Sequence, residues 1–353
     1  ACGSVRAYGD RGICDGLVRE GLVVVMVQYR LGILGFFSTG DESCPGNFGL
    51  WDQIAALRWV QENIAQFGGD KDNVTICGQS AGGACADLLT LSPHAQGLFH
   101  RVIPMAGNAR APWSHKSSTT EWCKRYAEDT LGIKADSTEA LIAELRRLPA
   151  ERLATALDAV LLRNEAQLGF CPVIDGDLLP APICDLLPNA PSLSVMIGLT
   201  TLECGLLIPD NNLTEAHLKM AVNALLPGGA SGATADELLA SYKEVALRKQ
   251  PENATWRALV EATSDRIINI ATVSVLLECN RGGASAYFYV FDYYNKKCIG
   301  PPANSAPCSE APHCAELAYV FNGGVIAPFA FSKDDERVAA LMMRAFANFA
   351  MRG

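Results

Sequence analysis

A serine flanked by small residues is the feature of this sequence that most clearly predicts chemistry. Residues 78–82 read Gly-Gln-Ser-Ala-Gly and lie between an apolar run at 74–77 and a helical pattern that continues to Leu89. A serine on a sharp strand-to-helix turn projects its hydroxyl above a sheet, and only small neighbours permit so tight a turn. We therefore expect Ser80 to be a nucleophile and the Ala81 amide to line an oxyanion hole. The competing interpretation is that Ser80 merely caps the helix.

The pattern of apolar residues around this turn predicts an α/β protein. Strands are expected at 21–27, 74–77, 102–105, 194–197 and 286–291, and amphipathic helices at 49–66, 256–277 and 333–351. Short apolar runs alternating with helices favour a mostly parallel, doubly wound sheet. Helical patterns at roughly 114–168 and 214–280 predict a helical insertion. Because no internal repeat or low-complexity linker interrupts the sequence, we expect a single domain over 1–353.

Composition excludes several other classes of protein. The 353 residues are 49% hydrophobic and 19% charged, and the net charge of −9 disfavours a surface for nucleic acid or anionic lipid. No run approaches the ~18 apolar residues of a membrane span. The 13 cysteines lack paired CxxC spacing, so neither a zinc site nor a metal or cofactor motif is predicted. One or two disulfides remain open among Cys279, Cys298 and Cys308.

Motifs of one enzyme family surround Ser80 and run through the chain. They are carried by residues 67–70 and 74–83, by 28–32, 35–38, 46–49, 52–53 and 56–60 upstream, and by 91–93, 98–101 and 348–350 downstream. In these segments the sequence resembles the type B carboxylesterase/cholinesterase family. The resemblance covers essentially the whole chain and is densest over 20–107. It implies an α/β-hydrolase fold and serine-dependent cleavage of carboxylic esters.

In α/β-hydrolases an acidic residue and then a histidine follow the serine along the chain. His313 lies in a loop rich in proline and cysteine just before the last helix, which suits delivery of a side chain to a site. Residues 313–317 also resemble the family's H-x-x-E-L segment, which carries the general base. The other histidines lie too close behind the serine or in polar stretches: His94, His100, His115 and His217.

Glu203 is the expected acid of the triad. It comes just after the strand at 194–198, at the strand end where open α/β sheets place their sites, and residues 198–203 resemble the family's acidic segment. Asp175 is a competitor that fits a turn better, and Asp210 is a weaker one. The triad would transfer the acyl group of an ester to Ser80 and then to water.

Some residues depart from the family pattern. The family takes two oxyanion-hole amides from a His-Gly-Gly-Gly run. Residues 1–5 resemble the family's residues just after that run, so we expect a fragment truncated at both ends. Gln79 stands where the family usually has Glu, a change expected to remove a charge without touching the triad. Cys314 follows the histidine and is expected to make the site sensitive to oxidation. Arg30, Asp70 and Glu316 are expected to be structural.

Three functional hypotheses remain at this point. The first is a serine hydrolase of carboxylic esters whose partner is a small-molecule substrate. The second is a non-catalytic cholinesterase-like adhesion or binding protein, a branch that typically loses the serine or the histidine. The third is an inactive truncated product without the oxyanion glycines. Acyl and alcohol specificity, oligomeric state and localisation are not predicted by the sequence.

Overall fold

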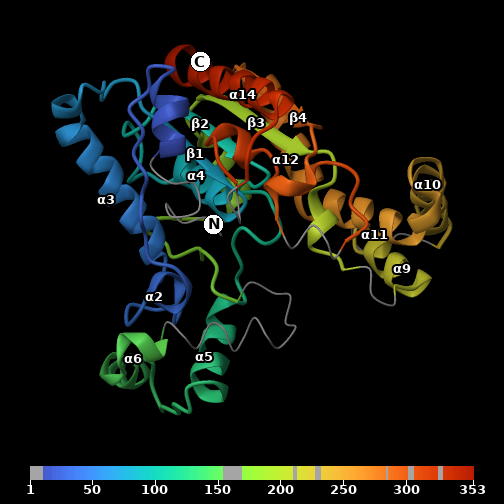
Figure 1. Cartoon of the computed structure of the whole chain (residues 1–353). Coiled ribbons are helices and arrows are strands. Elements are labelled where there is room, and N and C mark those ends of the chain that lie inside the picture. Colours follow the sequence, from blue (N-terminus) through green and yellow to red (C-terminus); the bar gives the residue numbers. More distant parts are fainter. Residues whose placement is uncertain are drawn as a thin grey trace.

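A computed structural model describes residues 11–153, 169–209, 213–226, 232–283, 285–300, 306–324 and 329–353. Its centre is a four-stranded sheet in which every neighbouring pair is parallel (Figure 1). The strands lie in chain order: β1 (Thr75–Gln79), β2 (Arg101–Met105), β3 (Ser194–Thr200) and β4 (Ala286–Phe291). The expected α/β class with a parallel sheet is thereby confirmed.

Helices connect and cover these strands. They are α2 (Gly32–Phe36), α3 (Phe48–Asn63), α4 (Ala81–Leu91), α5 (Thr119–Asp129), α6 (Thr138–Arg147), α8 (Ile183–Leu186), α9 (Glu215–Asn223), α10 (Gly232–Lys249), α11 (Ala254–Ser264), α12 (Ile270–Gly282), α13 (Leu317–Val320) and α14 (Lys333–Arg352). Short 3-10 or π turns are η1 (Cys14–Val18), η2 (Ile64–Phe67), η3 (Leu187–Asn189), η4 (Glu203–Leu206), η5 (Pro251–Asn253), η6 (Asp265–Asn269) and η7 (Lys296–Cys298). The expected helical stretch at 151–162 lies largely outside the described residues.

The two faces of the sheet bury alternate residues of each strand against different helices. Val102 of β2 and Val195 of β3 pack with Val275 of α12, whereas Ile103 and Met196 pack with Phe346 of α14. Such alternation follows from the two-residue period of a strand. Helices on both faces leave the carboxyl ends of the strands as the accessible edge for a site.

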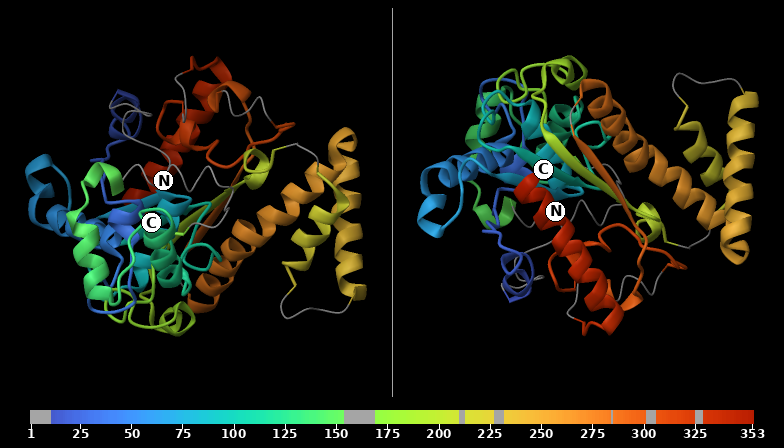
Figure 2. Two further views of the ribbon diagram at one scale, coloured as in Figure 1. Left: turned by 90° about the horizontal axis from the view of Figure 1, so that it is seen from below. Right: turned by 90° about the horizontal axis from the view of Figure 1, so that it is seen from above.

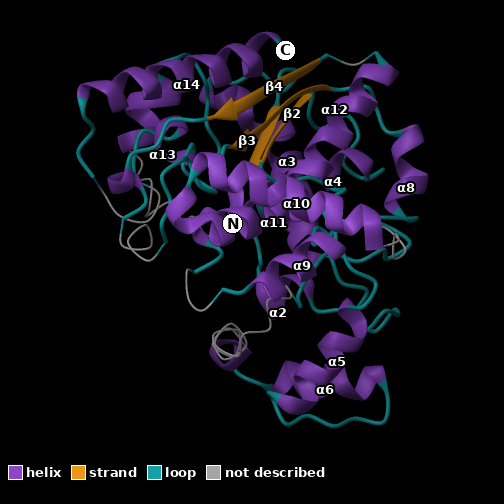
Figure 3. Ribbon diagram, turned by 90° about the vertical axis from the view of Figure 1, so that its right-hand side faces the viewer, coloured by secondary structure: helices purple, strands orange, loops and turns teal. Residues whose placement is uncertain are grey.

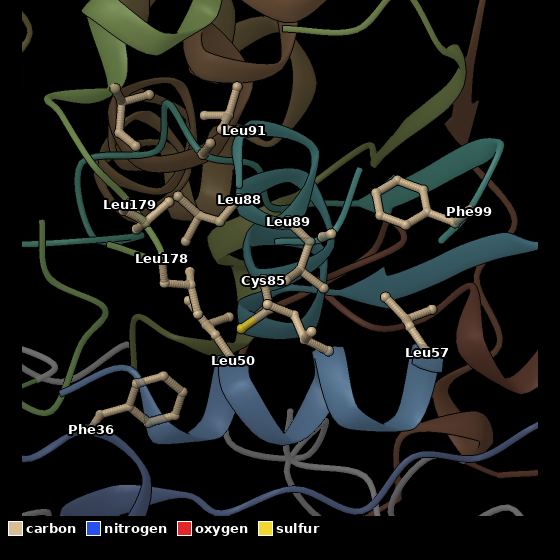
Figure 4. Packing of buried hydrophobic residues seen from close by; sticks show 14 residues of the cluster. Phe36, Leu50, Leu57, Cys85, Leu88, Leu89, Leu91, Phe99, Leu178 and Leu179 are labelled. Carbon is tan, nitrogen blue, oxygen red and sulfur yellow. The ribbon is translucent and has the colours of Figure 1, made fainter. Parts of the chain in front are cut away.

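The largest apolar cluster packs α3 against α4. Leu50 and Leu57 of α3 face Cys85, Leu88 and Leu89 of α4 (Figure 4). Leu50 and Leu88 are completely buried. Burial of each such side chain contributes about 1.5–3 kcal/mol, so this cluster fixes the helix that follows Ser80.

Two groups of helices lie apart from the sheet. The pair α5 and α6 lies at the opposite end of the molecule from α14 (Figures 1 and 3). Helices α9, α10 and α11 pack on one another and project from one side (Figure 2). None of the described helices combines the length and the apolar composition needed to cross a bilayer.

One sequence-based expectation about local structure was wrong, and one question that the sequence left open is answered. Residues 22–30 form an extended segment outside the sheet, and Val23, Val25 and Met26 expose 46, 41 and 39% of their surfaces. An apolar run forms a central strand only where neighbours pair on both sides, and no described strand pairs with this one. The disulfides left open among Cys279, Cys298 and Cys308 are also absent, because all three are free thiols.

Candidate active site

Ser80 lies on a sharp turn between β1 and α4, as its motif predicts. Its backbone has φ of 55° and ψ of −121°, a conformation that non-glycine residues rarely adopt. A Cβ on Gly78 would lie 2.1 Å from the carbonyl oxygen of Gly82, and one on Gly107 would lie 2.1 Å from that of Ser80. Both positions therefore require glycine. Ser80 precedes the helix, but its side chain makes no capping hydrogen bond, which removes the competing interpretation.

The start of α4 supplies one donor suited to an oxyanion. Ala81 is the first helical residue, so its N–H has no acceptor within the helix. The partial positive charge of a helix N-terminus also favours a developing negative charge there. The amide of Ala81 can therefore stabilise a tetrahedral intermediate formed on the neighbouring hydroxyl.

Glu203 is held rigidly beyond the end of β3. It begins η4, and its side chain is completely buried. One carboxylate oxygen, Oε1, accepts a hydrogen bond of 2.6 Å from the backbone N–H of Thr200. Donation by a fixed backbone amide orients the carboxyl group and leaves Oε2 directed at a second partner.

His313 is that partner, and backbone contacts bring its loop to Glu203. Leu202 donates to the carbonyl of Ala311 at 2.9 Å, and the N–H of His313 donates to the carbonyl of Glu203 at 3.2 Å. The side chains then meet, with His313 Nδ1 lying 2.5 Å from Glu203 Oε2. Sequence reasoning chose both residues although 110 positions separate them, and the structure brings them into direct contact.

The other ring nitrogen of His313 contacts Gln79 rather than Ser80. His313 Nε2 lies 3.1 Å from Nε2 of the Gln79 side chain, and among the described residues no hydrogen bond joins the imidazole to the Ser80 hydroxyl. The expectation that Gln79 leaves the triad untouched is therefore wrong. The contact spans 234 positions, and no periodic signal in the sequence marks it.

Charge and burial act in opposite directions on His313. Burial lowers the pKa of His313, whereas negative charge on Cys314 or Glu203 raises it, and the net pKa lies well above the usual value. Burial also raises the pKa of Cys314, which keeps that thiol neutral near pH 7. The carboxylate of Glu203 is therefore the physical cause of the raised pKa of His313.

Glu316 is a second buried carboxyl near the pair. It is 1% exposed, and its Oε2 has no hydrogen-bond partner among the described residues. Burial, together with the nearby charge of Glu203, raises the pKa of Glu316 to about 7. Sequence reasoning labelled this residue structural, and only its burial in the fold reveals a titration near neutral pH.

The competing acids and histidines have other roles or lie elsewhere. Asp175 closes a turn by accepting from the N–H of Leu179 at 2.9 Å, and Asp210 lies outside the described residues. Four histidines contact other partners: His94 contacts Asp177, His100 the backbone of Val74, His115 the hydroxyl of Ser114, and His217 the N-cap Thr214 of α9.

The remaining charged residues of the family motifs have structural contacts. Arg30 forms an ion pair of 2.8 Å with Asp52, although the arginine side chain is half exposed rather than buried. Asp70 accepts from the N–H of Asp72 in a turn. Among the described residues, no cluster of His, Cys, Asp or Glu side chains is arranged to hold a metal ion.

A small apolar cavity adjoins the oxyanion donor. It measures about 120 Å³ and contains Ala81 in its wall. Trp113, Phe170 and Phe36 supply aromatic surface around it. A cavity of this size accepts a short alkyl group beside the Ala81 amide.

Comparisons with known proteins give the same family over nearly the whole chain. The model of the carboxylesterase family matches residues 2–353. The chain is 36% identical to the esterase cest-33 of Caenorhabditis elegans over 341 residues, covering 94% of this chain and 61% of that protein. It is 32% identical to the bile salt-activated lipase of Bos taurus over 351 residues, covering 95% and 58% respectively.

A third relative is not named as an esterase or a lipase. The chain is 32% identical to neuroligin-3 of Mus musculus over 365 residues, covering 98% of this chain and 43% of that protein. The chain therefore spans between two-fifths and about three-fifths of the length of these curated relatives.

Proposed function

Since the chain belongs to the carboxylesterase family, whose fold is that of the α/β-hydrolases, we propose that it hydrolyses carboxylic esters through Ser80, His313 and Glu203. The observation that carries this proposal is the 2.5 Å contact between His313 and Glu203, next to the turn that holds Ser80. A buried carboxylate on an imidazole, beside a serine in strained backbone, is the arrangement that activates a hydroxyl. The esterase and lipase relatives support the same class of reaction.

The proposed reaction has two steps, acylation of Ser80 and hydrolysis of the acyl-enzyme. Ser80 Oγ attacks the ester carbonyl while His313 Nε2 takes the hydroxyl proton, and Glu203 stabilises the imidazolium that forms. The bond to the alcohol oxygen then breaks, and His313 returns the proton to the leaving alcohol. Water repeats these steps on the acyl-enzyme and releases the acid. The Ala81 amide donates to the oxyanion in both halves.

The acyl group is proposed to be short. The cavity beside Ala81 holds about 120 Å³, room for a few carbon atoms, and its walls are largely apolar. We therefore propose acetyl to butyryl esters as better substrates than octanoyl esters. A panel of nitrophenyl esters tests this order, and faster hydrolysis of the octanoate than of the butyrate would contradict it.

A second candidate is a non-catalytic binding protein on the same fold. The observation that favours it is the missing hydrogen bond between His313 and Ser80 among the described residues. The similarity to neuroligin-3 is also compatible with this candidate. In that case the site would keep these three residues but would not hydrolyse esters.

The two candidates are separated by labelling and hydrolysis with the full-length protein. A fluorophosphonate probe reacts with an activated serine, so we expect it to label the wild type and not Ser80→Ala. Ser117→Ala removes an exposed serine hydroxyl and is the matched control, expected to label like the wild type. Equal labelling and hydrolysis in Ser80→Ala and the wild type would exclude Ser80 as the nucleophile. No labelling of the wild type would favour the binding protein.

A further inference from the structure

The contact between Gln79 and His313 has a defined hydrogen-bond polarity. Glu203 Oε2 is a carboxylate oxygen and can only accept, so the 2.5 Å contact places the ring proton on His313 Nδ1. In the neutral ring Nε2 then carries a lone pair and can only accept. The side-chain NH₂ group of Gln79, 3.1 Å away, is the donor to that lone pair.

That lone pair is the one that must take the proton from Ser80. A ring nitrogen has a single in-plane lone pair, so while it accepts from Gln79 it has no second lone pair for the serine hydroxyl. Among the described residues the imidazole has Glu203, Gln79 and the thiol of Cys314 as hydrogen-bond partners and lacks Ser80. The base nitrogen is thus occupied in the neutral ring, the form that is present above the raised pKa of His313.

Gln79 is placed to make this contact by the strand that also places the serine. It is the last residue of β1, pairs with Met105 of β2, and exposes 7% of its surface. Its backbone is therefore fixed by the sheet, and only the side chain is free to turn away from the imidazole. Rotation of this side chain therefore moves the contact without any displacement of the strand.

We propose that Gln79 is a positioning residue that holds the base nitrogen of the neutral His313 ring away from Ser80 before substrate binds and releases it when a substrate binds. The inference rests on the proposed function of the same site and adds a control on its base. A neutral amide suits this task because it donates to the lone pair without adding charge, whereas a carboxylate has no proton to donate to it.

The groups facing His313 define what a substitution at Gln79 would change. Glu203 contacts Nδ1, and Glu316, Cys314 and Cys204 lie within electrostatic range of the ring. Among the described residues Glu316 and Cys204 make no hydrogen bond to Nε2, whereas the thiol of Cys314 does hydrogen-bond the ring. A change at Gln79 therefore acts on Nε2, while the interactions of Nδ1 stay as they are.

Two substitutions at this position should act in opposite directions. Gln79→Met keeps similar volume and removes the donor, so the lone pair becomes available to Ser80. Because one hydrogen bond no longer has to be broken, we expect phosphonate labelling of Ser80 to be about 2- to 10-fold faster at pH 8. Gln79→Glu places a negative charge against Nε2 and favours the imidazolium, so labelling at pH 7 should become at least about 10-fold slower.

The pH dependence of the labelling rate distinguishes a positioning role from a merely structural one. Loss of a structural role would leave this pH dependence unchanged. The Gln79→Glu carboxylate should raise the pKa of His313 further, and the acidic limb of the labelling rate should move up by about 1 to 3 pH units. Gln66→Glu adds the same charge at an exposed position of η2 and should leave the limb in place. Slower labelling by Gln79→Met, together with an acidic limb that does not move in Gln79→Glu, would mean that Gln79 only supports the fold. That result would overturn the proposal.

A spectroscopic measurement keeps this test independent of ester hydrolysis. With nitrogen-15 histidine in the full-length Ser80→Ala protein, the Nε2 resonance of neutral His313 reports hydrogen bonding directly. We expect Gln79→Met to move it toward the value of a lone pair without a donor, and Gln66→Glu to leave it unchanged. An unchanged resonance in Gln79→Met would also overturn the proposal. If the wild type fails to label although this resonance moves, the proposed function fails while the contact stands.

Discussion

The charged groups of the site act on the imidazole of His313. It touches a carboxylate on one nitrogen and an amide on the other, and its side chain is 11% exposed. A buried imidazole next to an ionised carboxylate gains a proton more readily than a free one. We therefore expect the protonation of His313 to affect both the proposed activity and the stability of the protein near neutral pH.

Substitution of the acid tests the orientation of this imidazole. In Glu203→Gln the Nδ1 proton loses its carboxylate partner and the ring can adopt the wrong tautomer, so we expect kcat to fall by about 10²–10⁴. KM should change little, because Glu203 is buried away from the substrate. Steady-state hydrolysis of nitrophenyl butyrate measures both. A loss below about 10-fold would contradict the role of Glu203.

The pH dependence of activity follows from the raised pKa of His313. The base must be neutral, so kcat/KM should fall as the pH drops through a value above about 6.5. Glu316 has a pKa of about 7 and titrates in the same range, so the limb belongs to both groups. Glu316→Gln is the control, because it removes the second titration. A limb below about pH 6 in the wild type would contradict the assigned charge on Glu203.

Stability should vary with pH through the same pair. The folded pKa of His313 is raised, so the protonated pair stabilises the fold fully below the unfolded pKa of about 6.5. This contribution is lost as the pH rises through the folded value. The free energy of unfolding of wild type minus that of Glu203→Gln should therefore be larger at pH 6 than at pH 10. Denaturant titrations at both pH values measure it, and an equal difference would contradict the pairing.

Sequence reasoning found the three residues with chemical signatures and missed their shared neighbour. Ser80 is marked by its flanking glycines, and the acid and the histidine by their order along the chain. Gln79 is an ordinary strand residue in the sequence, and its contact depends on where a loop 234 positions later returns. Proximity of this kind has no local signature. The burial that raises the pKa of Glu316 is equally invisible before folding.

The elements that carry the site were more predictable where local signals are strong. The strand at 286–291 and the helix from Lys333 have the bounds that their patterns predict. Ser332 and Asp335 form the capping box that begins this helix. The prediction of a strand at 21–27 was wrong, because apolar composition alone does not supply a neighbouring strand to pair with. Local pattern thus fixes an element only where its neighbours are also present.

The capping box of α14 gives a prediction at this scale. Asp335 is fully buried and accepts from Ser332, Asn295 and Tyr319. Burial raises the pKa of Asp335, but these donors outweigh it and hold the pKa at about 2. Asp335→Ala should lower the free energy of unfolding by about 3 kcal/mol at pH 7, because four donor groups from three residues lose their partner. Thermal or urea unfolding measures it.

A simpler cap provides the comparison. Ser137 caps α6 through one hydrogen bond of 3.2 Å from the N–H of Ala140, so Ser137→Ala should cost only about 1 kcal/mol. The cost of Asp335→Ala should also shrink as the pH falls from 5 toward 2, since the contribution of a depressed carboxyl pKa is lost there. Equal costs for the two substitutions would contradict the argument.

Over the whole molecule, a buried arginine joins the projecting helices to the histidine loop. Arg257 of α11 is completely buried and donates to both carboxylate oxygens of Glu310, at 2.8 and 2.9 Å. Its Nε donates to Glu261 at 2.8 Å. Glu310 precedes His313 by three residues. The helices α9 to α11 therefore support the loop that delivers the base, although they lie apart from the sheet.

Removal of this arginine should weaken both the fold and the site. Arg257→Met leaves Glu310 without its cation and Glu261 with Lys249 alone, so the free energy of unfolding should fall by about 3 kcal/mol. The histidine loop loses its anchor, so kcat should fall in the protein that remains folded. Arg248→Met on α10 is the matched control. Its ion pair with Glu244 lies on the surface with the arginine 73% exposed, and its loss should cost at most about 0.5 kcal/mol. Urea unfolding and ester hydrolysis, measured on both variants, test this link, and equal unfolding midpoints with equal kcat would show that the projecting helices do not support the site.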